Sequence, residues 1–289
     1  EEFRRTLLST NKHEEVIALI RIGSSAGGAR AKALVATDGQ GKFYDGTITH
    51  KGDYKYWLIK FDTENNSDRD GKDPKGMTRI EYIYSLFARK LGIDIPHTSY
   101  FEVGEDFHFL IERFDRVALD SGEVMKLHYA SWSALEHADR DTTGAYSYEQ
   151  LALTIREMGL KQNALNQLFM RAVFNVVGVN HDDHTKNFGF LMNQNGEWRF
   201  SPAFDMTYSY DPTGKWTKSH QIKLNQKQIG FTRDDLIAFA NYCDIKTVKA
   251  NRVIDNTIAE FKAFDAQADK YGVDAELKET ITKQLLIAL

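Results

Sequence analysis

The stretch HDDHTKNFGFL, residues 181–191, brings two histidines, two aspartates, a lysine and an asparagine into one short segment. It follows an apolar run between Leu165 and Val176, whose helical spacing predicts a buried helix that ends near Gly178. A solvated turn does not need this set of proton-accepting and metal-binding groups. The segment is therefore the first candidate for a chemical site, in a loop that follows a buried helix.

Asp182 and Asn187 have the Asp-x-x-x-x-Asn spacing of a protein-kinase catalytic loop. In such a loop the aspartate accepts the proton of the substrate hydroxyl and the asparagine holds magnesium. Lys186 could neutralise the phosphoryl group that is transferred. Asp205, in SPAFDMTY, follows where a second magnesium-binding aspartate is expected, and magnesium prefers such hard oxygen ligands. Asn187 and Asp205 are therefore the candidate metal ligands.

The same loop allows two other interpretations. His181 and His184 stand at i and i+3, a spacing that permits a transition-metal site. Together with Asp182 and Asp183 they would then centre a metal-dependent phosphohydrolase. Such an enzyme should copurify with its metal, whereas a kinase should need only added Mg²⁺ and ATP. The aspartates could also do no more than cap turns, which would leave a purely structural loop.

The first part of the chain is predicted to be rich in β-strands. Short or alternating apolar runs predict strands at residues 32–38, 56–62, 97–103 and 107–113. Residues 78–91 keep the apolar spacing of an amphipathic helix that Gly92 closes. Residues 62–76 are polar and without periodicity, which indicates a surface loop, and residues 1–22 fit either a helix or a strand.

GSSAGGARAK, residues 23–32, places glycines and small residues ahead of a lysine. Such a loop lets backbone N–H groups approach phosphate oxygens closely, although an ordinary flexible turn has the same composition. The pattern matches neither of the two common glycine-rich phosphate motifs. As a motif by itself it is therefore a weak indication of nucleotide binding.

Lys60 lies in YWLIKFD, a predicted strand that is otherwise apolar. Since strand side chains alternate, Lys60 shares one face with Leu58. A nucleotide phosphate could neutralise Lys60 there and a carboxylate could orient it, although a surface lysine could equally extend into solvent. Glu81 on the predicted helix is a candidate partner for Lys60, and it would also complete a capping box with Thr78.

The second part of the chain is predicted to be mostly helical. Residues 188–192 and 197–200 flank a Gln-Asn-Gly turn and predict a short hairpin. Residues 205–230 have no regular pattern. Thr232 and Asp235 have the spacing of a capping pair, which predicts the start of further amphipathic helices.

The order of these features is that of a protein kinase: glycine-rich loop, strand lysine, helix glutamate, a strand that ends in ERFDR (112–116), apolar helix, Asp-x-x-x-x-Asn, hairpin and aspartate. We therefore expect an α+β, two-lobed protein-kinase-like fold, with a β-rich N-lobe over residues 1–115 and a mostly helical C-lobe over residues 116–289. The complete set of strand lysine, catalytic aspartate and metal ligands argues against a catalytically silent module that only binds a partner.

These segments resemble the kinase core of the HipA family, the serine/threonine kinase toxins of bacterial toxin–antitoxin modules. The resemblance runs from about residue 20 to the end and rests on the strings SSAGGARAKAL, WLIKF, IERFDR, DDHTKNFGFL, SPAFDM and SHQIKLNQK. It implies ATP and Mg²⁺ as cofactors and a kinase that phosphorylates a translation factor, such as an aminoacyl-tRNA synthetase. It also implies an antitoxin protein as partner.

The resemblance further implies roles for individual residues. It makes Asp182 the catalytic base and Asn187 and Asp205 the metal ligands, and Lys186 belongs to the same catalytic loop. The nucleotide contacts that it implies are Ser25, Ala26, Gly27, Gly28, Ala29, Lys32, Lys60 and His184, with Glu112 and Phe114 at the adenine hinge.

Two features depart from the longer members of that family. Those members carry an additional N-terminal subdomain, so we expect this sequence to be either a shortened form or a naturally short, HipT-like relative. The glycine-rich loop also holds two adjacent serines, Ser24 and Ser25. Self-phosphorylation of the loop serine silences such kinases, and the resemblance points to Ser25 or its neighbour as the modified residue.

Charge and composition bound what the chain can do. Its 37 Lys and Arg against 41 Asp and Glu give a net charge of −4, so the whole molecule offers no electrostatic footprint for duplex nucleic acid or an anionic membrane. We therefore expect no direct binding to duplex nucleic acid, although the net charge leaves room for a local basic site. The single cysteine, Cys243, excludes an intramolecular disulfide and a cysteine-built zinc site. No run approaches the length of a membrane span and the start is unlike a signal peptide, so we expect a cytoplasmic protein.

Overall fold

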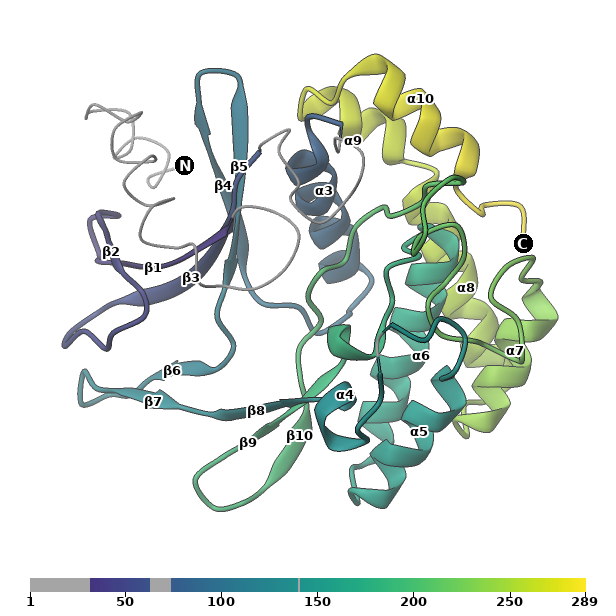
Figure 1. Cartoon of the computed structure of the whole chain (residues 1–289), viewed down its shortest axis with the longest axis horizontal. Coiled ribbons are helices and arrows are strands. Elements are labelled where there is room, and N and C mark those ends of the chain that lie inside the picture. The colour runs from purple at the N-terminus through teal and green to yellow at the C-terminus, as the bar shows by residue number, and fades with distance from the viewer. Residues whose placement is uncertain (1–31, 63–73, 140) are drawn as a thin grey trace. The chain divides into compact units, whose positions relative to one another are not determined.

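Figure 1 shows a computed structural model of the chain, which describes residues 32–62, 74–139 and 141–289. The glycine-rich loop, residues 1–22 and most of the predicted loop 62–76 lie outside these residues. The contacts divide the described chain into two compact units. The first holds the described residues up to Tyr82, Pro96–Leu127 and Gly272–Asp274, and the second holds Ile83–Ile95, His128–Tyr271 and Ala275–Leu289.

The first unit is built on a five-stranded antiparallel sheet with the strand order β2-β1-β3-β5-β4. Its strands are β1 (Lys32–Thr37), β2 (Phe43–Asp45), β3 (Lys55–Lys60), β4 (Thr98–Val103) and β5 (Asp106–Glu112). A separate antiparallel pair consists of β6 (Arg116–Ala118) and β7 (Val124–Lys126). The four strands that the sequence predicts correspond to β1, β3, β4 and β5, so that prediction is confirmed.

The register of this sheet determines which side chains share a face. Lys60 pairs with Lys32 on β1 and with Phe109 on β5, so these three side chains lie on one face together with Leu58. The opposite face carries a buried apolar cluster of Ala33, Val35, Trp57, Ile59, Phe61, Phe101 and Leu110. The alternation predicted for the strand that contains Lys60 is therefore confirmed.

Helix α3 (Met77–Lys90) begins one residue earlier than predicted, and the predicted capping box is wrong. The Thr78 hydroxyl is buried and donates to the carbonyl oxygen of Phe107 at 2.5 Å, so it does not cap the helix with Glu81. A tertiary hydrogen bond thus replaces the local one. At the other end Gly92 has φ +81°, a left-handed conformation that glycine adopts without strain, and this confirms the predicted helix end.

The second unit contains a small antiparallel sheet with the order β10-β9-β8. Its strands are β8 (His128–Ser131), β9 (Gly189–Met192) and β10 (Trp198–Phe200). The predicted hairpin is confirmed as β9 and β10. The sequence did not predict β8, because its residues HYAS carry no alternating apolar pattern.

Helices make up most of the rest of this unit. They are α4 (Trp132–Leu135), α5 (Tyr148–Glu157), α6 (Gln162–Val177), the 3-10 turn η2 (Thr185–Asn187), α7 (Arg233–Tyr242), α8 (Thr247–Phe261), α9 (Phe264–Lys270) and α10 (Ala275–Gln284). Thr232 and Asp235 form the predicted capping box at the start of α7. Among the described residues, no helix combines the length and the apolar character of a membrane span.

Helix α6 ends at Gly178, which leads directly into the candidate catalytic loop. A Cβ on Gly178 would lie 2.5 Å from Cζ of Phe261 and 2.9 Å from the carbonyl oxygen of Phe174. Both distances are far below van der Waals contact, and one of the two atoms belongs to the backbone. The position therefore needs glycine for packing, although its φ of −82° is open to any residue.

Replacing Gly178 by alanine should destabilise the fold by about 1–3 kcal/mol, because overpacking a rigid contact costs that much. The free energy of unfolding in urea measures the effect. Gly39→Ala is the matched control, because the added Cβ meets nothing closer than 4.0 Å. An unfolding midpoint for Gly178→Ala equal to that of the wild type would contradict this account of the helix end.

Candidate functional site

In the first unit, Lys60 at the end of β3 contacts Glu81 on α3. Nζ of Lys60 lies 2.6 Å from Oε1 of Glu81, and the two residues are only 7% and 2% exposed. Removing both charges from water costs free energy, and the attraction between them offsets that cost only when the geometry is good. The sequence left Glu81 between a capping role and a partnership with Lys60, and the structure shows the partnership.

Lys32 adds a second positive charge beside this pair. It lies directly opposite Lys60 across β1 and β3, and like charges in such a cross-strand position repel each other. Lys32 and Lys60 therefore place two positive charges on this part of the face, beside the Glu81 carboxylate. A phosphate would neutralise these charges through charge-assisted hydrogen bonds.

The IERFDR segment forms a turn after β5, with Glu112 at the end of the strand and Phe114 two residues on, both half-buried. The Asp115 carboxylate accepts two hydrogen bonds from Arg113, at 2.9 and 2.8 Å, and one from Arg116 at 2.6 Å. Burial alone would raise the pKa of Asp115, but the hydrogen bonds and charges of the two arginines outweigh it and lower that pKa. These ionic contacts hold the turn that carries Glu112 and Phe114.

In the second unit, the candidate catalytic loop joins α6 to β9. Nδ2 of Asn187 donates to the backbone carbonyl of Asp182 at 2.6 Å, which closes the loop over η2. The amide oxygen of Asn187 is then the atom that can bind a cation. The Asp182 side chain is 37% exposed, so its carboxylate is accessible to a substrate.

Asp205 has a backbone conformation that residues other than glycine seldom adopt. Its φ is +53°, and such a residue costs on the order of 1–3 kcal/mol and is found most often at functional sites. Nδ2 of Asn180 donates to the Asp205 carbonyl at 3.3 Å. Asn187 and Asp205, the two expected metal ligands, therefore both lie on segments that are hydrogen-bonded to residues 180–182.

The loop also carries His184 and Lys186. Nε2 of His184 lies 3.8 Å from Oδ1 of Asp182, too far for a hydrogen bond, and its Nδ1 is buried with no hydrogen-bond partner in the described part of the chain. Lys186 is exposed. The imidazole of His184 thus lies beside the Asp182 carboxylate without a direct hydrogen bond to it.

His181 and Asp183 are buried and already have partners. Nδ1 of His181 lies 3.0 Å from the Thr217 carbonyl, and burial together with the charge of His220 lowers the His181 pKa to about 4. Asp183 is 1% exposed and accepts hydrogen bonds from three donors. Among the described residues, no three His, Cys, Asp or Glu form a metal site, so the phosphohydrolase centred on residues 181–184 gains no support from the structure.

The sequence did not single out four buried residues that contact this loop: Tyr148, Asn175, Asn180 and His220. His220 lies in the string SHQIKLNQK, so its position was marked but not its role. Tyr148 and Asn175 are polar residues on amphipathic helices, and nothing in the local pattern distinguishes them from surface residues.

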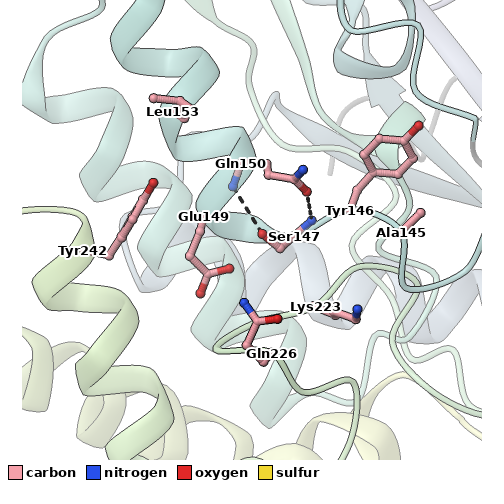
Figure 2. Close-up of a pocket in the computed structure, with 9 residues that line it drawn as sticks. All are labelled: Ala145, Tyr146, Ser147, Glu149, Gln150, Leu153, Lys223, Gln226 and Tyr242. Carbon is pink, nitrogen blue, oxygen red and sulfur yellow. Dashed lines mark hydrogen bonds between the residues drawn. The ribbon is translucent and has the colours of Figure 1, made fainter.

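Two cavities lie apart from these residues. One of about 350 Å³ opens at the start of α5 and is lined by Ser147, Glu149 and Lys223, among others (Figure 2). The other, of about 630 Å³, lies in the first unit beside Trp57 and His97. Neither of these two cavities is lined by the lysine, aspartate or asparagine residues of the candidate site.

Residues 24–265 match the family described as the HipA-like C-terminal domain. The chain belongs to this family. HipA of Shewanella oneidensis MR-1, solved as a complex with HipB and its operator DNA, has a TM-score of 0.68 and 18% identity, over 94% of this chain and 69% of that one. The Helicobacter pylori proinflammatory kinase CtkA has a TM-score of 0.50 and 14% identity, over 82% of this chain and 88% of that one. A comparison with curated protein sequences gave no match.

These findings confirm the expected family and the expected α+β, kinase-like fold. The expectation that charge rules out contact with duplex nucleic acid is not borne out, because the Shewanella HipA was solved together with operator DNA. The net charge of a HipA-family chain averages over its whole surface and does not describe a local patch or a partner bound to it.

Replacing one member of the Lys60–Glu81 pair should cost more stability than replacing both. Glu81→Leu leaves the Lys60 ammonium buried without this carboxylate, which costs about 3–5 kcal/mol, whereas Lys60→Met combined with Glu81→Leu should recover most of that loss. The free energies of unfolding of the wild type, the two single variants and the double variant, measured in urea, form a double-mutant cycle that gives the coupling between the two residues.

The exposed pair Glu279–Lys283 is the matched control for this cycle. Its equivalent substitutions should change the free energy of unfolding by no more than about 0.5 kcal/mol. Additive losses at Lys60 and Glu81 would show that the two charges are not coupled.

Proposed function

We propose that this chain is an ATP-dependent serine/threonine protein kinase and the toxin component of a bacterial toxin–antitoxin module. The observation that carries the proposal is the buried Lys60–Glu81 pair with Lys32 opposite it, in a chain whose fold is shared with the kinase CtkA. Protein kinases require a strand lysine held by a helix glutamate. The proposal includes a kinase N-lobe over residues 1–115 and a C-lobe over residues 116–289.

The donor groups of the chain fit ATP and Mg²⁺. The amide oxygen of Asn187 and the carboxylate of Asp205 are hard ligands of the kind that Mg²⁺ prefers, and phosphates and water complete such a site. When bound, Mg²⁺ neutralises charge on the phosphates. In the first unit, Lys60 and Lys32 supply positive charge to which nucleotide phosphates can bind.

The other nucleotide contacts are proposed from the family. The backbone of residues 25–29 and the imidazole of His184 would bind phosphates. Glu112 and Phe114 would bind the adenine, on the turn that Arg113 holds through Asp115.

Asp182 is the proposed catalytic base. Its accessible carboxylate orients the hydroxyl of a serine or threonine and accepts its proton as the oxygen forms a bond to the γ-phosphorus, whose bond to the ADP oxygen breaks. Lys186, exposed on the same loop, neutralises the phosphoryl group during transfer. The role of the protein is thus to position the acceptor and to balance charge.

The proposed substrate is a translation factor such as an aminoacyl-tRNA synthetase. An antitoxin protein is proposed as partner, because the Shewanella HipA was solved with HipB. A cytoplasmic location is part of the proposal, since Cys243 is the single cysteine of the chain and is a buried free thiol.

Asp182→Asn should abolish phosphoryl transfer and leave the affinity for Mg·ATP within a factor of about two, because the amide keeps the shape but cannot accept the proton. The measurements are transfer of γ-phosphate to the proteins of a bacterial lysate, read by mass spectrometry, and nucleotide binding by calorimetry. Asp211→Asn, an exposed aspartate, is the control and should transfer at the wild-type rate. Transfer by Asp182→Asn at the wild-type rate would show that the base lies elsewhere.

Incubation with Mg·ATP should add one phosphate to Ser25 or Ser24 and lower the affinity for ATP. A phosphate adds about −1.5 to −2 charges, which compete with those of the nucleotide for the same backbone amides. The double alanine variant should stay active and be more toxic to its host, while Ser121→Ala, at an exposed serine, should behave as the wild type. Intact mass before and after incubation measures the modification. An active enzyme that gains no phosphate on either serine is incompatible with this switch.

A further inference from the structure

The proposed mechanism gives no role to the buried carboxylate of Asp183. Asp183 follows the proposed base directly in the chain, and its side chain is fully buried. We propose that Asp183 is the centre of a buried hydrogen-bond network that positions both Asp182 and Asp205 for phosphoryl transfer. This inference rests on the proposed kinase function and adds positioning residues to it.

Three donors from two different segments meet at the Asp183 carboxylate. Oδ2 accepts from the hydroxyl of Tyr148 at 2.8 Å and lies 2.7 Å from Nδ1 of His220. Oδ1 accepts from the backbone N–H of Gln221 at 2.8 Å. Both oxygens therefore have partners, and Asp183 joins the start of α5 to the segment that follows Asp205 in the chain.

The network continues from Tyr148 to Asp205. Nδ2 of Asn175, on α6, donates to the Tyr148 hydroxyl at 2.9 Å. Nδ2 of Asn180 donates to Oδ1 of Asn175 at 3.0 Å and to the backbone carbonyl of Asp205 at 3.3 Å. An unbroken series of hydrogen bonds thus links the Asp183 carboxylate to the backbone of the proposed metal ligand.

The side chains of this network are removed from water. Tyr148, Asn175, Asn180, Asp183 and His220 are between 1% and 3% exposed. Burial raises the pKa of Tyr148 well above its usual value and the charge of Asp183 raises it further, so the hydroxyl stays protonated and donates a hydrogen bond to Asp183. Breaking one hydrogen bond would leave a buried polar group without its partner, which costs free energy. The network therefore resists displacement of its members.

The network constrains Asp182 through its backbone. The carbonyl of Asp182 accepts from Asn187, and the side chain of the next residue, Asp183, is held by its three donors. These contacts hold the backbone on the C-terminal side of Asp182, and with it the point from which the Asp182 carboxylate projects. A shift of about 1 Å in such a group costs on the order of a hundredfold in rate, so a positioning network has a measurable effect on turnover.

Tyr148→Phe tests the network, because it removes one hydroxyl and keeps the ring between Phe188 and Phe239. The full chain with Mg·ATP and its protein acceptor should lose about tenfold or more in kcat, while KM for ATP changes by less than about twofold. Tyr84→Phe is the matched control. Its hydroxyl is equally buried and donates to the carbonyl of Gly178 at 2.7 Å, outside the network.

The two variants should lose similar thermal stability, and only Tyr148→Phe should lose kcat. Equal kcat values in the two variants, or a rise in KM with unchanged kcat, would overturn the inference. Asn175→Ala should reproduce the effect of Tyr148→Phe without touching Asp183, and adding Tyr148→Phe to it should cause little further loss.

A wild-type chain that transfers no phosphate would refute the proposed function and leave this network to be decided by amide hydrogen exchange. Tyr148→Phe should then speed exchange in both residues 180–187 and residues 205–221, whereas Tyr84→Phe should not. Exchange that is unchanged in either segment would overturn the network on its own.

Discussion

A carboxylate buried among helices needs a hydrogen-bond donor for each oxygen, and Asp183 places this requirement at the centre of the second unit. Its donors come from the start of α5 and from residues 220 and 221, which follow the irregular segment after β10. These parts of the chain are distant in sequence, so satisfying one carboxylate brings them together. The loop that carries Asp182 is held between them.

The first unit treats its charges differently. Asp183 is held by three hydrogen-bond donors, whereas Lys60 lies opposite Lys32 across two strands and forms an ion pair with Glu81 on α3. Like charges directly opposite each other on neighbouring strands are destabilising, and a bound anion would relieve that cost. The charge of Asp183 therefore serves the structure of the second unit, whereas the charges of Lys60 and Lys32 suit a phosphate ligand.

Backbone strain accompanies the polar network. Val179 and Asp205 have φ values of +55° and +53°, and a β-branched valine in this region is an outlier. Between them, Asn180 pairs with Ser209, and its side chain donates to Asn175 and to the carbonyl of Asp205. These hydrogen bonds offset the strain and make the crossing of the two segments specific.

Local pattern in the sequence was enough to predict the strands that hold Lys32 and Lys60, the helix that ends at Gly178, the hairpin after the catalytic loop and the capping box of α7, because periodicity and turn chemistry act over a few residues. Tertiary structure alone decided the contacts between distant groups. Thr78 bonds Phe107, 29 residues away, instead of capping its own helix, and Glu81 meets Lys60 across 21 residues. Asp183 and His220 are 37 residues apart, and no local pattern shows which of two adjacent aspartates turns inward. Burial and hydrogen bonding across the fold determine that choice.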